Sequence, residues 1–180
     1  KDLLGNIETV YLGGGTPSYL GNKRLSSILY ALSVSMHLTP EVECTLEANP
    51  DSLTAAMVRD VYALGVTRIS LGVQSFDDTV LKTLGRIHTC EKALQAIQCA
   101  QERFSNISID LMCGLPGQTL ESFRHDLECA LSLGIKHISI YPLTIEEGTV
   151  FDQLVSDGTL HFDEDFGAQC MEEAHHLLTQ

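Results

Sequence analysis

Several features that would assign the chain to a membrane, secreted or nucleic-acid-binding class are missing. No apolar run approaches the roughly 18 residues that a membrane-spanning helix needs. No basic segment followed by an apolar one opens the chain, as a secretory signal would. After Lys136 there is no Lys or Arg, whereas nine Asp or Glu follow. A net charge of −13 argues against a nucleic-acid partner, because that affinity depends on cations that neutralise phosphates. These absences favour a soluble globular protein.

A paired-cysteine motif is also missing. The chain has six cysteines but no C-x-x-C, and their spacing is irregular: Cys44, Cys90, Cys99, Cys113, Cys129 and Cys170. This usage predicts reduced cysteines that behave as small apolar residues, and hence a cytoplasmic protein. A metal site that uses Cys90 and Cys99 stays open, although structural sites normally pair their ligands at closer spacing.

What the chain does contain is a repeated order of elements. Five short apolar, β-branched runs each stop at glycine or polar residues and lead into a helical stretch: Ile7–Leu12, Cys44–Leu46, Arg68–Val73, Ile107–Met112 and His137–Tyr141. Leu64–Leu71 and Leu133–Ile140 repeat one corner, in which a helix ends, a glycine takes the left-handed position and a strand begins. The alternation predicts an α/β fold with parallel strands, built as a partial (β/α) barrel in a single domain.

The helical stretches between these runs are amphipathic and should pack on the sheet. One apolar stripe, with Asp51 or Ser52 as its cap, comprises Leu53, Met57, Val58, Val61 and Leu64. A second stripe, opened by Thr119 with Glu121 in its first turn, comprises Phe123, Leu127, Ala130 and Leu131. The last part of the chain favours two further helices, Thr149–Val155 and Phe166–Leu178, with no further strand.

Polar and glycine residues that follow the strands are the candidate site residues, because the carboxyl ends of parallel barrel strands form one mouth. Gly14, Gly15 and Thr16 follow the first strand, and consecutive glycines let a backbone approach a ligand closely. The alternative is a tight turn without function. Glu47 ends the second strand, and its carboxylate can accept two hydrogen bonds from a ribose diol or one from an ammonium group. The alternative is a structural carboxylate tied to an arginine or to backbone amides.

For three further polar residues the same two alternatives stay open, a ligand-binding role and a structural role. Gln74 and Asp110 are placed at the ends of the next two strands, so that Glu47, Gln74 and Asp110 stand on successive strand ends. Arg86 lies after a helical stretch, and its guanidinium can hold a carboxylate through two parallel bonds or stay a surface residue. His88 is interpreted as structural, because no second His or Cys stands at metal-ligand spacing from it.

The sequence motifs in these segments resemble those of a known family. The matching motifs are Tyr11–Ser18, Leu46–Pro50, Gly72–Phe76, Leu84–His88 and Asp110–Thr119. In this order they resemble the radical S-adenosylmethionine proteins of the oxygen-independent coproporphyrinogen III oxidase family, and most of all its haem-chaperone (HemW) branch. The likeness extends from Ile7 to about Thr149.

The resemblance implies a partial (β/α)6 barrel that binds S-adenosylmethionine and a [4Fe-4S] cluster. It also implies a tetrapyrrole and a haem-acceptor protein as partners. By position, Gly14, Gly15 and Thr16 would contact the methionine moiety. Glu47, Gln74 and Asp110 would hold ribose hydroxyls or the ammonium group. Arg86 would meet a carboxylate. Leu143, after the last strand, would offer its backbone to the adenine.

The chain departs from this family in its cysteines. The C-x-x-x-C-x-x-C cluster motif does not occur in the sequence, and thiolates are what hold such clusters. We therefore expect residues 1–180 to be the central part of the domain, strands two to six of six, with the first βα unit and a C-terminal domain outside it. Alone, this chain should not assemble the radical-generating centre, so enzymatic activity is left open.

Three functional readings follow. The first is a HemW-like haem chaperone, and the second is a coproporphyrinogen III oxidase that decarboxylates propionates oxidatively. The third, of another class, is a non-catalytic barrel that acts as a binding module.

Overall fold

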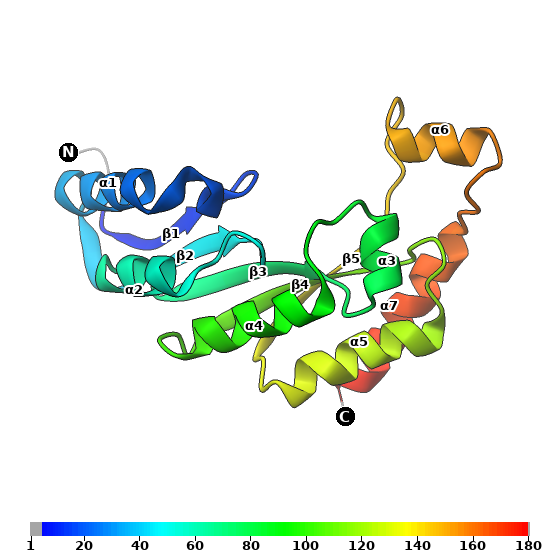
Figure 1. The fold of residues 1–180 in the computed structure, drawn as a ribbon. Helices are drawn as coiled ribbons and strands as arrows, with labels where there is room; N and C mark the ends of the chain where they lie inside the picture. The colour runs from blue at the N-terminus through cyan, green and yellow to red at the C-terminus, as the bar shows by residue number, and fades with distance from the viewer. Residues whose placement is uncertain (1–4, 180) are drawn as a thin grey trace. The chain divides into compact units, whose positions relative to one another are not determined.

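The structure is a computed structural model, and it describes residues 5–179. Five strands form one sheet in the order β1-β2-β3-β4-β5 (Figure 1). Their bounds are β1 Ile7–Leu12, β2 Leu38–Ala48, β3 Arg68–Gln74, β4 Ile107–Cys113 and β5 His137–Pro142. β1 and β2 pair in parallel, as do β2 and β3. Each strand of the predicted alternation is present, and the sequential order is the one that right-handed βαβ units produce.

Helices connect the strands along the chain. They are α1 Gly21–Ser35, α2 Ala55–Ala63, α3 Asp78–Thr83, α4 Cys90–Gln101, α5 Leu120–Ser132, α6 Val150–Ser156 and α7 Glu164–Leu178, with a 3-10 turn at Pro17–Leu20. The two helices expected after the last strand are therefore present. Within residues 5–179, no helix is both long enough and apolar enough to cross a membrane.

β2 is longer than the sequence suggested. The apolar run predicted only Cys44–Leu46, whereas the strand begins at Leu38. Its first half contains Pro40 and the exposed Glu41 and Glu43, which break the apolar pattern that the prediction used. The register between β1 and β2 is also irregular between Ile7 and Thr9. A polar, partly irregular stretch gives little periodic signal, so its strand character was not visible in the sequence.

The chain packs as two compact units. The first comprises residues up to 73 together with 91–109, and the second comprises 74–90 together with the chain from 110 onward. In the first unit the fully buried side chains include Leu25, Leu46, Ile69 and Ile97, contributed by two helices and two strands. In the second unit Leu111, Phe123 and Leu127 are fully buried, so α5 packs its apolar stripe inward as predicted.

Two details of the predicted helices were wrong. Thr54, and not Asp51 or Ser52, caps α2, because its side chain accepts a hydrogen bond from the Met57 N–H (3.2 Å). Leu131 in α5 is 44% exposed and does not belong to the buried stripe. Thr119 caps α5 as predicted and forms a reciprocal capping box with Ser122.

Candidate functional site

The glycine loop after β1 needs glycine at each of three positions, for two different reasons. Gly14 and Gly15 have φ of 86° and 117°, a backbone region that side-chain-bearing residues rarely adopt. At Gly13 the constraint is steric, since an added Cβ would lie 2.8 Å from Glu47 Cδ and 2.6 Å from the Tyr11 ring. The loop is therefore shaped to pass close to the carboxylate of Glu47.

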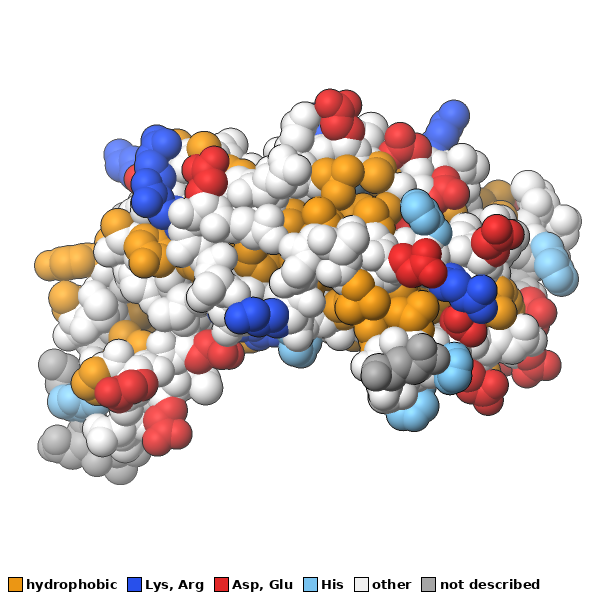
Figure 2. Space-filling model, turned by 90° about the horizontal axis from the view of Figure 1, so that it is seen from below, with side chains coloured by type: hydrophobic (Ala, Val, Ile, Leu, Met, Phe, Trp, Pro, Cys, Tyr) orange, Lys and Arg blue, Asp and Glu red, His pale blue; other side chains and the backbone are white. Residues whose placement is uncertain are grey.

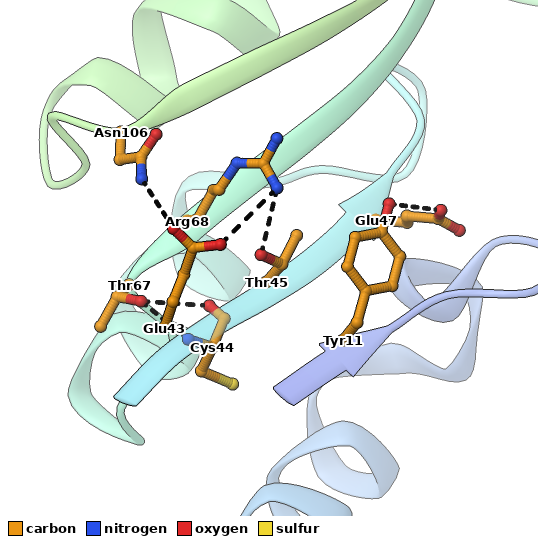
Figure 3. A network of polar contacts seen from close by, with 8 residues as sticks. All are labelled: Tyr11, Glu43, Cys44, Thr45, Glu47, Thr67, Arg68 and Asn106. Atoms are coloured by element: carbon orange, nitrogen blue, oxygen red, sulfur yellow. Dashed lines mark hydrogen bonds and ion pairs between the residues drawn. The ribbon is translucent and has the colours of Figure 1, made fainter. Parts of the chain in front are cut away.

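Glu47 is held toward this loop by two hydrogen bonds. The Tyr11 hydroxyl donates to Oε1 (2.8 Å), and the Gly14 N–H donates to Oε2 (3.1 Å). Figure 3 shows the Tyr11 ring standing beside the Glu47 carboxylate, with the two residues on neighbouring strands. The carboxylate is half-buried, so it remains accessible to a ligand while its position is fixed.

Arg68 contacts side chains farther back along β2, at Glu43 and Thr45. Its guanidinium lies 3.9 Å from Glu43 and donates to the Thr45 hydroxyl at 3.4 Å (Figure 3). Asn106 also donates to Glu43 (3.5 Å). The bond from the Gly14 N–H is one of the structural roles that the sequence leaves open for Glu47, a carboxylate tied to a backbone amide.

Thr16 completes the loop. Its hydroxyl accepts a hydrogen bond from the Asn49 side chain (3.0 Å), which ties the loop after β1 to the loop after β2. A hollow of about 310 Å³ adjoins this loop, with Gly14 and Thr16 on one side and the α1 side chains Leu25 and Ile28 on the other. Gly14, Thr16 and Glu47 thus form one connected group in the first unit.

Gln74, at the end of β3, has a strained backbone. Its φ is 70°, and it is the one non-glycine residue with positive φ in the part of the chain that the structure describes. Such conformations cost of order 1–3 kcal/mol and persist where the surroundings impose them. The strain singles out Gln74 among the predicted site residues, and no sequence pattern indicated it.

Asp126 is a residue that the sequence reasoning missed. It lies on α5 among the apolar positions of the buried stripe, is 1% exposed, and accepts hydrogen bonds from Ser75 and Phe76 directly after Gln74. A signal was present, because an aspartate stands three residues after Phe123 and just before Leu127, where an amphipathic helix faces its core.

The remaining predicted residues lie in the second unit. Arg86 is half-buried in the loop after α3, where its N–H closes the helix by donating to the Leu81 carbonyl (2.9 Å). Asp110 is half-buried in the middle of β4, so its predicted place at the end of the strand was wrong, because the strand continues to Cys113. Leu143 follows β5, and its N–H donates to the Cys113 carbonyl (2.9 Å).

A cavity of about 650 Å³ lies beside Leu143. Apolar side chains that include Val155, Phe162 and Met171 line it together with the carboxylates of Asp152, Asp163 and Glu164. An apolar surface with several carboxylates suits a flat apolar ring carried by a cationic ligand, because the carboxylates favour positive charge nearby. More generally the surface is acidic, and the face in Figure 2 carries more Asp and Glu than Lys and Arg.

One wall of this cavity depends on two glycines in contact. A Cβ on Gly114 would lie 2.9 Å from the Gly167 Cα in α7, whereas a Cβ on Gly117 would meet nothing within 4 Å. Both residues have positive φ, 69° and 80°. Gly114→Ala should therefore lower the free energy of unfolding by about 1–3 kcal/mol more than Gly117→Ala, since both substitutions strain the backbone and only the first also overpacks. Urea denaturation of the two variants measures the difference, and equal losses would show that α7 moves aside freely.

The cysteines do not form a metal site in the described structure. All six are free, with Cys44, Cys113 and Cys170 buried. Burial raises the pKa of the Cys44 thiol, which disfavours the thiolate that a metal would need. Residues 5–179 contain no group of three or more His, Cys, Asp or Glu side chains that could hold a metal ion. The described residues therefore do not supply a set of ligands for a [4Fe-4S] cluster.

Sequential parallel strands, a glycine loop after the first of them and polar groups near the following strand ends define the class of α/β barrel proteins that bind a ligand at the carboxyl ends of their strands. The profile of the radical SAM superfamily matches residues 2–130. The chain belongs to this superfamily, whose members use S-adenosylmethionine and a [4Fe-4S] cluster.

Particular relatives sharpen the placement. The chain is 39% identical over 158 residues to the haem chaperone HemW of Bacillus subtilis, covering 87% of this chain and 42% of that protein. It is 38% identical over 176 residues to the mitochondrial radical S-adenosyl methionine domain-containing protein 1 of Bos taurus, covering 97% and 40%.

The fold has a close match among solved structures. The coproporphyrinogen III oxidase HemN of Escherichia coli, a radical SAM enzyme, superposes with a TM-score of 0.85 at 26% identity, covering 97% of this chain and 41% of that one. The predicted partial parallel (β/α) barrel of the radical-SAM type is thereby confirmed. The chain spans well under half the length of these relatives.

Proposed function

We propose that this chain is the barrel portion of a HemW-like radical SAM protein, which binds S-adenosylmethionine and a tetrapyrrole and acts as a haem chaperone. The observation that carries the proposal is the 39% identity to a haem chaperone across 87% of the chain. The expected boundaries are part of it: residues 1–180 supply the central strands, and the cluster cysteines lie outside this chain.

In the first unit, the glycine loop and Glu47 would hold the amino-acid end of S-adenosylmethionine. Gly14, Gly15 and Thr16 would contact the methionine moiety through backbone N–H groups and a hydroxyl. Glu47 would accept from the ammonium group or a ribose hydroxyl. The bonds from Tyr11 and Gly14 support this role, because they fix the carboxylate before a ligand arrives and so reduce the entropy lost on binding.

In the second unit, Gln74 and Asp110 would hold ribose hydroxyls or the ammonium group, and Arg86 would meet a carboxylate. Leu143 would offer its backbone to the adenine, and the neighbouring cavity of about 650 Å³ supports that role because it combines apolar side chains with carboxylates. S-adenosylmethionine is itself a cationic ligand with a flat ring, so its chemistry suits such a lining.

A second candidate function is oxidative decarboxylation of coproporphyrinogen III. The likeness to the E. coli enzyme favours it, with a TM-score of 0.85. The identity of 26% to that enzyme is lower than the 39% to a haem chaperone, so we rank it second.

For the location we propose a reducing compartment, the cytoplasm, because the six cysteines are free. The Bos taurus relative is named as a mitochondrial protein, and the interior of mitochondria is also compatible with free thiols. Cell fractionation with an antibody against the chain distinguishes the two compartments.

The test uses the full-length protein after anaerobic cluster reconstitution. We expect haem to bind with a new Soret band, S-adenosylmethionine to bind in calorimetric titration, and bound haem to pass to an apo-haemoprotein. Coproporphyrinogen III should not be consumed. Its decarboxylation would instead establish the oxidase function, and a protein that binds neither haem nor S-adenosylmethionine would be a binding module of another kind.

A further inference from the structure

A buried carboxylate on α5 holds the turn that follows Gln74. Oδ2 of Asp126 accepts from the Ser75 hydroxyl (2.8 Å), and Oδ1 accepts from the Phe76 backbone N–H (2.7 Å). All three residues are buried, with Ser75 fully inaccessible and Phe76 6% exposed. Both oxygens of one side chain are therefore used to fix two consecutive residues of a loop.

The same bonds continue into the next helix. The Ser75 hydroxyl oxygen accepts from the Asp77 N–H (3.0 Å), and the Asp77 side chain caps α3 by accepting from the N–H groups of Thr79 (2.7 Å) and Val80 (3.3 Å). The segment from Ser75 to the first turn of α3 is thus fixed by consecutive hydrogen bonds. Gln74 is the residue directly before this segment, and its φ of 70° is the strained one.

α5 provides a firm base for the carboxylate. Phe123, Leu127 and Ala130 on the same helix are fully buried, and the Thr119–Ser122 capping box fixes its first turn. A side chain with packed neighbours on both sides has little freedom to follow a moving loop. The loop therefore adapts to Asp126, which explains why a strained backbone persists one residue away.

The buried carboxylate of Asp126 lowers the stability of the folded state. Burial raises the pKa of Asp126 to about 6, even though the bonds from Phe76 and Ser75 lower it. Of the neighbouring charges, Asp77 raises this pKa and His125 lowers it. Two acceptor oxygens without a proton are what two converging donors need, and a carboxylate supplies them. Stability alone would favour an uncharged residue at a position facing the core.

We propose that Asp126 is a positioning residue for ligand binding: it holds the Ser75–Phe76 turn so that Gln74 keeps its left-handed backbone and presents its carboxamide to S-adenosylmethionine. The inference rests on the proposed function, because it requires Gln74 to touch that ligand. It adds a residue that acts through Gln74 without contacting the ligand itself.

A double-mutant cycle tests this relation in the full-length, reconstituted protein with S-adenosylmethionine as the titrant. Gln74→Ala should weaken binding. Asp126→Ala should weaken binding by roughly 5- to 150-fold. A released Gln74 relaxes to negative φ, so only a small fraction of the molecules keeps the left-handed conformation that binds the ligand. The double variant should bind no more weakly than the weaker single variant, since Asp126 acts only through Gln74.

The outcomes separate the two proposals. Additive effects of the two substitutions, or unchanged affinity in Asp126→Ala beside weakened affinity in Gln74→Ala, would overturn the positioning role alone. Unchanged affinity in Gln74→Ala would overturn the ligand role of Gln74 and the positioning role with it. If Asp126→Ala does not fold, Asp126→Asn and Ser75→Ala replace it in the cycle, since each removes one acceptor or one donor.

Two controls exclude a merely structural effect. Leu127→Ala removes buried packing from the same helix but touches no bond of the turn, so it should lower the melting temperature and leave the affinity of the folded protein unchanged. Hydrogen exchange of the Phe76 amide should accelerate in Asp126→Ala, because that N–H loses its acceptor. An unchanged exchange rate would show that Asp126 does not hold the turn and would overturn the proposal.

Discussion

Glu47→Gln is expected to weaken S-adenosylmethionine binding by roughly 10- to 150-fold in the full-length, cluster-loaded protein, with little change in melting temperature. A hydrogen bond to a charged group contributes about 1.5–3 kcal/mol, and the amide keeps the size of the side chain while it removes the charge. The Gly14 N–H and the Tyr11 hydroxyl, which now donate to Glu47, can still reach the amide oxygen or water because the site is half-exposed. Calorimetric titration beside a melting curve measures both effects.

Tyr11→Phe is the matched control. It removes the hydrogen bond to Glu47 Oε1 but leaves the carboxylate and the Gly14 bond in place. Affinity should therefore fall much less than in Glu47→Gln. If Tyr11→Phe weakens binding as strongly, the hydroxyl and not the charge is the important group.

Asp110→Asn extends the test to the second unit, and the same direction is expected. If Glu47 and Asp110 serve the fold instead, the two amides would lower the melting temperature, and the affinity of the remaining folded protein would stay unchanged. Unchanged affinity in both variants would contradict the assignment of these carboxylates to a ligand site.

Four of the five strands were predictable from their short apolar, β-branched runs. β3 and β4 contain largely apolar runs in which five of the seven residues are buried, and their predicted bounds differ from the structure by one residue at the end. β2 was predicted only over its buried part, Cys44–Leu46, since the exposed first half is polar. Burial is not required, because β1 was predicted with the bounds that it has in the structure and β5 to within one residue, although neither contains a buried residue.

The sequence predicted where the glycine loop lies but not why glycine is needed at each of its positions. Consecutive glycines after a strand indicated a close backbone approach, and the structure supplies the reason in the positive φ of Gly14 and Gly15 and in the contact of Gly13 with Glu47. For Gln74 the residue type gave no hint of left-handed backbone, and the bonds that fix the next two residues come from the distant helix α5. Long-range hydrogen bonds of this kind leave no periodic trace in a sequence.

The helix caps show a related limit. Thr119 was assigned correctly as the cap of α5, whereas Thr54 was passed over in favour of Asp51 or Ser52 as the cap of α2. In the structure Ser52 bonds back to the Asn49 carbonyl (3.0 Å) and so belongs to the preceding turn. Several capping residues in a row compete, and the backbone geometry of the loop decides among them.

The stability of the protein should fall as the pH rises through 6, owing to Asp126. Its pKa is about 6 in the folded protein against an ordinary value of 3.8, so the folded state keeps this proton more tightly than the unfolded state. The resulting stabilisation is fully present below the ordinary value and is lost as the pH rises through about 6. At 1.36 kcal/mol per pKa unit, the loss amounts to about 3 kcal/mol.

Asp126→Asn removes this titration, so the free energy of unfolding of the variant minus that of the native protein should rise by about 2–3 kcal/mol between pH 4 and pH 7.5. The other acidic groups cancel in the difference, because both proteins share them. Asp157→Asn is the control of opposite sign: hydrogen bonds from Thr159 lower the pKa of the exposed Asp157, so its contribution is present at neutral pH and is lost as the pH falls. Urea denaturation at a series of pH values measures both differences. A constant difference for Asp126→Asn would mean that the carboxylate is not desolvated in the folded protein, and the cost that its position on α5 implies would then be absent.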